Sequence, residues 1–316
     1  MNIVNIAYVF DDNYAPHACA SIASVLEKRD SKRSYHFYLF APDLELEHRE
    51  KITGFIETYS QHYTIINTQA FDYANFYQEI EKRYGRGKKN TAAQFFKILF
   101  ENYLPADVDR IISLDSDTIA LSDLSELFDR DLHGQTLAAV SENISKNHLK
   151  EIGFARRAIY FNSGVLLIDM KKWREQCVDD ALMQRFNNEP NYSMHDQDLL
   201  NIEFKDNFFQ LPQRYNQMVY LFNVPALFLK IRLRYMLVKG LGEEGIMHYT
   251  GAKPWQAECW HPYRHLYFKA LAKTPYHDMT LPQDLNRRVM GFITAFSLGR
   301  KVVKLLRKSG VANHDA

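Results

Sequence analysis

Apolar runs that end in polar turns recur along the first half of the chain. Residues 3–10, 36–40 and 63–66 have the length and composition of strands, while residues 18–26 and 45–59 show helical spacing. Strands that alternate with helices indicate an α/β fold with one mainly parallel sheet, covered by helices on both faces. Ligands bind outside the carboxyl ends of the strands in such a sheet, so the polar turns there are candidate sites.

The later part of the chain continues this pattern. A helix is predicted over residues 92–103, where apolar residues share one face and Pro105 follows. Further predicted elements are strands at 110–114, 136–140, 165–169 and 245–249, and helices at 124–128 and 170–186. Because no GxGxxG follows the first strand, a dinucleotide-binding Rossmann domain is disfavoured.

Two acids stand at the end of a buried strand. The apolar run of residues 111–114 gives way abruptly to Asp115-Ser116-Asp117. Two carboxylates there can share a hard divalent cation, which prefers oxygen ligands, and the cation can hold a diphosphate. The alternative is a polar turn, where aspartate is common.

Three later segments also have a structural and a functional interpretation. Residues 162–164, Asn-Ser-Gly, form either a tight turn or a place where the backbone approaches a ligand. Asp196 or Asp198 can cap the helix predicted after them, or acids and amides there can hold sugar hydroxyls. His248 can be a core residue, or it can join the two acids as a manganese ligand. Lys253, in a glycine-containing loop, is a cation suited to phosphate.

The charge is distributed unevenly. The composition of 46% hydrophobic and 24% charged residues is typical of a soluble globular protein and does not suggest a nucleic-acid-binding module. Residues 285–314, however, contain seven basic residues and no acid. Apolar residues recur there at helical spacing, which indicates a basic amphipathic helix on an anionic membrane surface. A helix packed on its own domain is the alternative. Residues 229–235 form a second basic and apolar segment, which either lines an acceptor or is an ordinary helix.

Cysteine usage and the amino terminus favour a reducing compartment. Cys19, Cys177 and Cys259 are far apart and lack CxxC spacing, which argues against a disulfide framework or a zinc site. Met1 leads almost directly into an apolar strand, so no signal peptide is expected. Since no stretch has about 18 uncharged apolar residues, a spanning helix is not expected either.

Five motifs together resemble those of glycosyltransferase family 8. They are Asp11-Asp12-Asn13-Tyr14, Leu114-Asp115-Ser116-Asp117, Phe161-Asn162-Ser163-Gly164-Val165, His195-Asp196-Gln197-Asp198 and His248-Tyr249-Thr250-Gly251-Ala252-Lys253-Pro254-Trp255. In this order the chain looks most like bacterial members that add galactose or glucose from a UDP-sugar to lipopolysaccharide or lipooligosaccharide. The resemblance extends from the first strand to about Tyr267.

The resemblance implies a GT-A fold in residues 1–267, and the basic amphipathic pattern predicts a helical tail in residues 268–316. It implies a Mn²⁺ (or Mg²⁺) ion held by Asp115, Asp117 and His248 and bridging the UDP diphosphate. The other donor-binding residues that it implies are Asp11, Asn13 and Tyr14 at the uridine, Gly251 and Lys253 at the phosphates, Asn162, Asp196 and Gln197 around the hexose, Lys97 at donor oxygens, and Ser116. The chain departs from the family pattern at Lys97, where arginine is frequent, and at His195, where glutamine is frequent.

The activity implied is transfer of a hexose to a hydroxyl of a lipopolysaccharide or other surface glycan with retention at the anomeric carbon. A same-face mechanism is favoured, in which Gln197 stabilises the oxocarbenium-like centre, because an amide is a poor nucleophile. Asp196 is the candidate nucleophile for the alternative double displacement. The expected location is the cytoplasmic face of the membrane, with a glycolipid or oligosaccharide acceptor.

Three other functions remain open on the sequence. A sugar nucleotidyltransferase also uses Asp-x-Asp and a metal, but it normally has a glycine-rich basic loop after the first strand, where this chain has acids. A non-catalytic nucleotide-sugar-binding protein could retain the same residues. A self-glycosylating initiator is the third, given 19 tyrosines.

Overall fold

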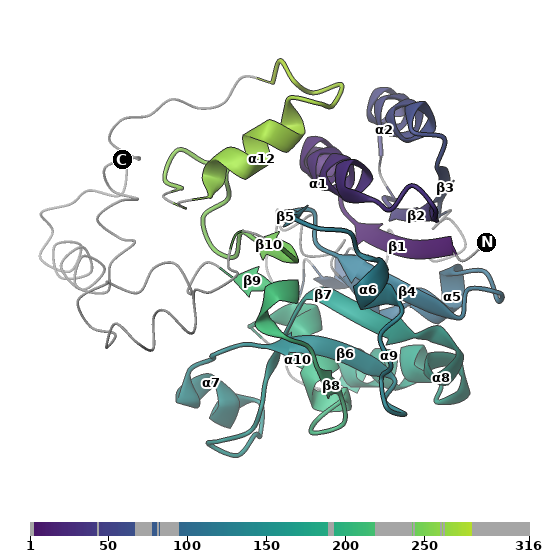
Figure 1. Cartoon of the computed structure of the whole chain (residues 1–316). Helices are drawn as coiled ribbons and strands as arrows, with labels where there is room; N and C mark the ends of the chain where they lie inside the picture. The colour runs from purple at the N-terminus through teal and green to yellow at the C-terminus, as the bar shows by residue number, and fades with distance from the viewer. Residues whose placement is uncertain are drawn as a thin grey trace, which may run out of the picture.

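A seven-stranded sheet forms the centre of the molecule (Figure 1). The computed structural model describes residues 3–42, 44–66, 78–80, 82, 95–188, 193–218, 242, 244–259, 261 and 263–279. Along the sheet the strands are β3 (His62–Ile65), β2 (Ser34–Phe40), β1 (Ile3–Val9), β4 (Arg110–Leu114), β7 (Phe161–Asp169), β6 (Leu137–Ser141) and β8 (Phe209–Gln210).

The strand directions are mixed. Strands β3, β2, β1 and β4 are parallel to one another, and β8 is parallel to β6. Strand β7 runs antiparallel to both β4 and β6. The prediction of a mainly parallel sheet is therefore confirmed, with one reversed strand.

A second sheet corrects the expectation of a single one. It has three strands in the order β5 (Thr118–Ala120), β10 (Ile246–His248) and β9 (Gln217–Met218). Strand β10 is antiparallel to β5 and parallel to β9. Strand β10 lies within the strand predicted over residues 245–249, whereas β5 and β9, with three and two residues, gave no clear sequence signal. The small sheet brings the late part of the chain beside the end of β4.

Successive side chains along each strand point to opposite faces of the large sheet, so each face has its own hydrophobic core. Val4, Ile6 and Tyr8 of β1 belong to the core beneath α1 (Ala15–Lys28), α2 (Leu46–Thr58) and α12 (Arg264–Leu271). Ala7 and Val9 belong to the opposite core. That core includes residues of α8 (Met170–Glu175), α9 (Val178–Asn188) and α10 (His195–Glu203), which lie in the lower half of Figure 1.

Two predicted helices are broken. The helix predicted over residues 170–186 is split into α8 and α9, because Cys177 between them has a φ of +50°. The described part of the helix predicted over 92–103 consists of the 3-10 turn η3 (Phe95–Ile98) and α5 (Phe100–Tyr103). Every residue from 95 to 100 is buried, so the single apolar face that the periodicity indicated does not exist.

Residues 162–164 do not form the tight turn considered above. They lie inside β7, where the register against β6 shifts between Ala139 and Val140. Ala139 pairs with Leu166 while Val140 pairs with Asn162, so β7 bulges between these two pairs. The bulge places the backbone of residues 163–165 at the end of β4.

The remaining elements are short. They are η1 (Asp12–Tyr14), α6 (Ser125–Phe128), α7 (Lys146–Glu151) and η4 (Gln213–Tyr215).

The start of the predicted tail belongs to the main body of the structure. Helix α12 crosses the predicted boundary between residues 267 and 268, and its Leu271 belongs to the main core. Residues 280–316 and 229–235, and with them the membrane helix and the second basic segment, lie outside the described residues. Within the described part, no helix has the length and apolarity needed to cross a bilayer.

Candidate metal centre and adjoining pocket

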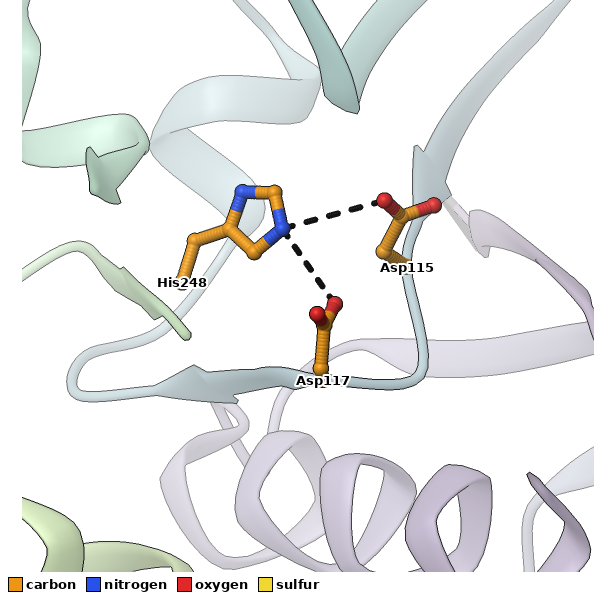
Figure 2. Close-up of side chains that lie close together, drawn as sticks. All are labelled: Asp115, Asp117 and His248. Carbon is orange, nitrogen blue, oxygen red and sulfur yellow. Dashed lines mark ion pairs between the residues drawn. The ribbon is translucent and has the colours of Figure 1, made fainter. Parts of the chain in front are cut away.

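Three strands bring two acids and a histidine together. After β4 ends at Leu114, Asp115 N donates to Gly164 O (2.9 Å), and the chain turns so that β5 begins at Thr118. Thr118 stabilises this turn because its hydroxyl donates to Asp115 O (2.7 Å). His248 at the end of β10 pairs with Thr118, which places its ring beside both acids (Figure 2).

The geometry of this cluster suits a cation. His248 Nε2 lies 3.2 Å from Asp117 Oδ1 and 3.7 Å from Asp115 Oδ2, and the three ligating atoms lie within 4.8 Å of one another. Asp117 and His248 are buried, whereas the Asp115 side chain is 32% exposed. Two carboxylates and one imidazole form a donor set that accepts Mn²⁺. Asp115, Asp117 and His248 are therefore a candidate metal centre.

Two lysines orient the carboxylates from outside the cluster. Lys97 donates to Asp115 Oδ1 and Lys253 to Asp117 Oδ2. Each acid therefore keeps its second oxygen towards His248. Burial opposes ionisation of Asp117, but Lys253 and His248 outweigh it and hold its pKa below the usual value. Burial likewise opposes the charge on Lys97, but Asp115 and Asp196 raise its pKa, so both lysines and Asp117 are charged near neutral pH.

Gly164 provides the space for the cluster. A Cβ atom at this position would lie 2.2 Å from His248 Cε1 and 2.9 Å from Asp115 Oδ2. The glycine of the Asn162-Ser163-Gly164 motif thus admits an imidazole and a carboxylate against the strand backbone, rather than only a ligand.

A pocket of about 410 Å³ opens beside the cluster. Its lining includes twelve of the residues predicted from the sequence: Asp11, Tyr14, Lys97, Asp115, Ser116, Asp117, Asn162, Asp196, Gln197, His248, Gly251 and Lys253. The remaining one, Asn13, is exposed on η1 and is not among the lining residues. Asp11 Oδ2 and Ser116 Oγ are buried without a hydrogen-bond partner, so both offer polar atoms to a bound molecule.

Aromatic side chains hold the loop that carries Lys253. Trp255 stacks on His17 of α1 with ring centroids 3.4 Å apart, and Tyr14 meets both rings edge-on. His17 Nδ1 is 2.7 Å from the hydroxyl of Tyr267 in α12, and burial lowers the pKa of His17 to about 3. A neutral imidazole therefore fixes the loop next to Asp117.

Helix α10 supplies the acid and the amide on the other side of the pocket. Its N-cap residue is Met194, so neither Asp196 nor Asp198 occupies the N-cap position. Asp198 accepts from Met194 N (2.9 Å) and the Tyr160 hydroxyl (2.6 Å), and is fully buried. Asp196 lines the pocket, and burial raises its pKa to about 6, partly offset by Lys97 3.9 Å away.

The hydrogen-bond partners of Gln197 fix which side-chain atom of its amide is the oxygen and which is the nitrogen. Its Oε1 accepts from Ser163 N (2.9 Å), which can only donate, and from Asn162 Nδ2 (3.0 Å). Its Nε2 donates to Glu142 Oε2 (3.1 Å), which accepts when ionised. Gln197 is therefore held by β7 on one side and by Glu142 on the other.

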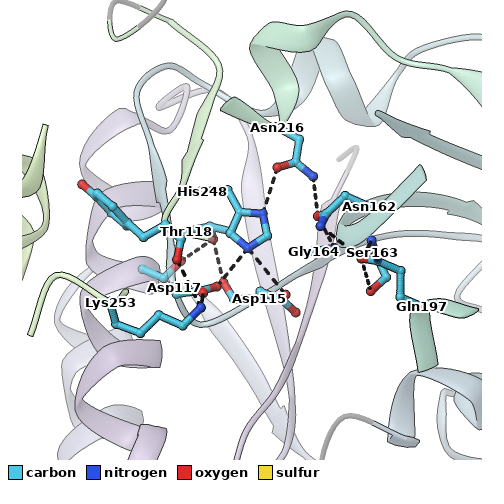
Figure 3. A network of polar contacts seen from close by, with 12 residues as sticks. Asp115, Asp117, Thr118, Asn162, Ser163, Gly164, Gln197, Asn216, His248 and Lys253 are labelled. Carbon is cyan, nitrogen blue, oxygen red and sulfur yellow. Dashed lines mark hydrogen bonds and ion pairs between the residues drawn. The ribbon is translucent and has the colours of Figure 1, made fainter. Parts of the chain in front are cut away.

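Sequence reasoning missed two residues of this network. Glu142 follows the apolar strand β6 and carried the same signal as Asp115, a carboxylate directly after a buried run. Asn216 is fully buried between His248 and Asn162 (Figure 3), but it stands in an irregular polar segment and carried no signal.

Comparison with known proteins identifies the family. The model described as "Glycosyl transferase family 8" matches residues 5–259. The chain is 27% identical over 288 residues to general stress protein A of Bacillus subtilis (strain 168), covering 89% of this chain and 97% of the relative. It is also 27% identical over 290 residues to the lipopolysaccharide 1,2-glucosyltransferase of Escherichia coli (strain K12), covering 89% and 81%.

A solved structure supports the fold. The chain is similar to the crystal structure of the galactosyltransferase LgtC in complex with donor and acceptor sugar analogs, with a TM-score of 0.68 and 24% identity, over 88% of this chain and 98% of that one. The α/β GT-A fold predicted from the sequence is thereby confirmed. With the family model spanning most of its length, this chain belongs to glycosyltransferase family 8 and is a retaining glycosyltransferase.

Proposed function

We propose that the protein transfers galactose or glucose from a UDP-sugar to a hydroxyl of a lipopolysaccharide or other surface glycan, with Mn²⁺ or Mg²⁺ as cofactor. The observation that carries the proposal is the cluster of Asp115, Asp117 and His248 beside a polar pocket. The names of two relatives support the substrate class, a lipopolysaccharide 1,2-glucosyltransferase and a lipopolysaccharide 1,3-galactosyltransferase.

The pocket offers groups for each part of the donor. Asp115, Asp117 and His248 would hold the metal, which supplies Lewis-acid neutralisation of the diphosphate. Lys253 and Gly251 line the pocket next to this centre, and we assign them to the phosphates. Asp11, Asn13 and Tyr14 are assigned to the uridine, with Ser116 beside them, and Lys97, Asn162, Asp196 and Gln197 to the hexose.

We assign a same-face mechanism to the transfer. Lys253 stabilises the charge on departing UDP, and an oxygen of that leaving group accepts the proton of the acceptor hydroxyl. Gln197, held between β7 and Glu142, presents a neutral amide to the anomeric centre, and Asp196 adds negative charge nearby. Intact-protein mass spectrometry with a slowed donor is expected to show no glycosyl adduct, whereas an adduct on Asp196 would establish double displacement.

A donor panel tests the function. UDP-sugars are incubated with a lipopolysaccharide-type acceptor and either Mn²⁺ or EDTA, and the linkage of any product is typed by NMR. We expect UDP release from UDP-galactose or UDP-glucose that requires both metal and acceptor. Pyrophosphate release from a nucleoside triphosphate and a sugar phosphate would favour a nucleotidyltransferase, and gain of hexose mass without acceptor would favour a self-glycosylating initiator. Metal-dependent binding without any turnover would favour a non-catalytic binding protein.

Replacing Lys97 by methionine is expected to increase the stabilisation that Mn²⁺ gives. The substitution removes the cation that pairs with Asp115, so the apo protein loses charge compensation and a metal ion can restore it. Thermal unfolding with and without Mn²⁺ measures the effect. The control is Lys51→Met, which removes an exposed lysine paired with Glu47 on α2 and leaves the Mn²⁺ shift unchanged. An equal shift in Lys97→Met and the unmodified protein would contradict this role.

We further propose that residues 285–314 hold the enzyme at the cytoplasmic face of the membrane. The support is the sequence, since seven basic residues without an acid contribute about 1 kcal/mol each near anionic lipid. A protein truncated after residue 280 is expected to stay in the supernatant when anionic liposomes are pelleted, while the full chain sediments with them. Sedimentation of the truncated protein would show that the tail is not the anchor.

A further inference from the structure

A chain of buried amides joins His248 to Gln197. Asn216 Oδ1 lies 2.9 Å from His248 Nδ1, and Asn216 Nδ2 donates to Asn162 Oδ1 (2.8 Å). Asn162 Nδ2 in turn donates to Gln197 Oε1 (3.0 Å). Figure 3 shows Asn216 between the imidazole and Asn162, on the side of the ring away from the two acids.

The direction of each hydrogen bond is fixed by the backbone of β7. Gly164 N can only donate, and it donates to Asn162 Oδ1 (2.9 Å), so the atom that Asn162 presents to Asn216 is an oxygen. Asn216 must therefore donate through its Nδ2, and its Oδ1 faces His248. An oxygen acceptor there requires the proton on His248 Nδ1.

In the neutral imidazole, which is the form that binds a metal, a proton on Nδ1 leaves the lone pair on the other ring nitrogen. His248 Nε2 is the atom that faces Asp115 and Asp117, at 3.7 Å and 3.2 Å. A ring held by its Nδ1–H to a neutral acceptor is the arrangement that orients histidine for metal binding. Gly164 contributes twice, because its amide fixes Asn162 and its missing side chain admits the ring.

We propose that Asn216 is a positioning residue that holds His248 in its metal-binding tautomer and, through Asn162, couples the metal centre to the amide at the sugar. The proposal rests on the proposed metal-dependent function. It adds a role for Asn216 to that function, and we expect the loss of each of its two hydrogen bonds to have a separate consequence. The bond to His248 serves the metal, and the bond to Asn162 serves the hexose.

Two substitutions separate these bonds. Asn216→Leu removes both and is expected to weaken Mn²⁺ binding about 10-fold to 100-fold, as loss of an outer hydrogen-bond partner of a metal ligand does. Asn216→Asp keeps an oxygen for His248 Nδ1–H but places a second oxygen against Asn162 Oδ1. Its Mn²⁺ affinity is expected to stay within about threefold of the unmodified protein. Its preference for UDP-galactose or UDP-glucose over UDP is expected to fall.

The matched control is Asn201→Leu. Asn201 is also a buried asparagine. It bonds Phe161 N and O on the same strand and the Gln197 backbone carbonyl (2.8 Å), but not the side chains of His248, Asn216 or Asn162. It is expected to lower thermal stability without changing Mn²⁺ affinity. Mn²⁺ binding is followed by the electron paramagnetic resonance signal of the free ion, and binding of UDP and UDP-sugars by calorimetry.

The histidine tautomer gives a readout that needs no metal. In the metal-free protein labelled with ¹⁵N-histidine, His248 is expected to show a preference for a proton on Nδ1, hydrogen-bonded to Asn216 Oδ1, assigned by comparison with His248→Gln. Asn216→Leu, or Asn216→Ser if the leucine variant does not fold, is expected to lose this preference. An unchanged tautomer and unchanged Mn²⁺ affinity in the folded variant would overturn the proposal. If the unmodified protein shows the tautomer but binds no Mn²⁺, the proposed metal-dependent function fails instead.

Discussion

Gly164→Ala is expected to abolish Mn²⁺ binding and to reduce hexose transfer at least about 100-fold, which corresponds to about 2.7 kcal/mol. The added methyl group would lie 2.2 Å from His248 Cε1 and 2.9 Å from Asp115 Oδ2, so the ring and the carboxylate must both move. Strand β7 cannot retreat easily, because it pairs with β4 on one side and β6 on the other. The methyl group therefore displaces two of the three candidate ligands.

The matched control for this prediction is Gly54→Ala. Gly54 is exposed in α2, and a Cβ atom there would meet nothing within 4 Å. Alanine at this helical position is expected to leave transfer unchanged and to raise stability by about 1 kcal/mol. Mn²⁺ titration and donor turnover are measured on both variants. Normal Mn²⁺ affinity in a folded Gly164→Ala protein would contradict the proposed position of the metal.

Asp117→Asn is expected to reduce transfer at least about 1000-fold, or about 4 kcal/mol. The substitution removes a carboxylate ligand and also leaves Lys253 without its ion-pair partner in a largely buried position. Breaking a buried pair by removing one partner costs about 3 kcal/mol or more, so the unfolding free energy should fall as well. Kinetics with UDP-galactose and UDP-glucose and chemical denaturation measure the two effects.

A double substitution separates stability from chemistry. In Asp117→Asn/Lys253→Met the unpaired cation is gone, so much of the stability is expected to return, while Mn²⁺ binding and transfer stay lost. Asp129→Asn, on an exposed carboxylate paired with Arg33, should change neither property appreciably. Transfer within tenfold of the unmodified enzyme in Asp117→Asn would mean that Asp117 is not a metal ligand.

The strands and the acidic pair were predictable because their signals are local. Ile111, Ile112 and Leu114 are buried as the apolar run indicated, and the acids follow at the strand end. The reversed direction of β7 was not predictable, because an apolar run such as Val165–Ile168 reads the same in parallel and antiparallel strands. The break at Cys177 carried no signal either, since cysteine has no special preference for positive φ.

The candidate site also has a part that the sequence predicts and a part that it does not. Asp115, Asp117 and His248 were grouped by motif order, and the structure brings them together through β5 and β10. Strand β10 lies within the strand predicted over 245–249, but β5, with three residues, was not predicted. Asn216 could not be identified, because its importance lies in two neighbours that are 54 and 32 residues away in the chain. The local sequence around a buried asparagine in an irregular segment does not show whether its side chain faces a histidine.

The most direct test is the position of a bound metal. Crystals grown with Mn²⁺ and UDP, with diffraction recorded at the manganese absorption edge, locate the ion independently of the protein model. We expect one anomalous peak bonded to Asp115, Asp117 and His248 Nε2, with diphosphate oxygens completing its coordination. A peak elsewhere, or UDP bound in this pocket without an ion between these three side chains, would contradict the account.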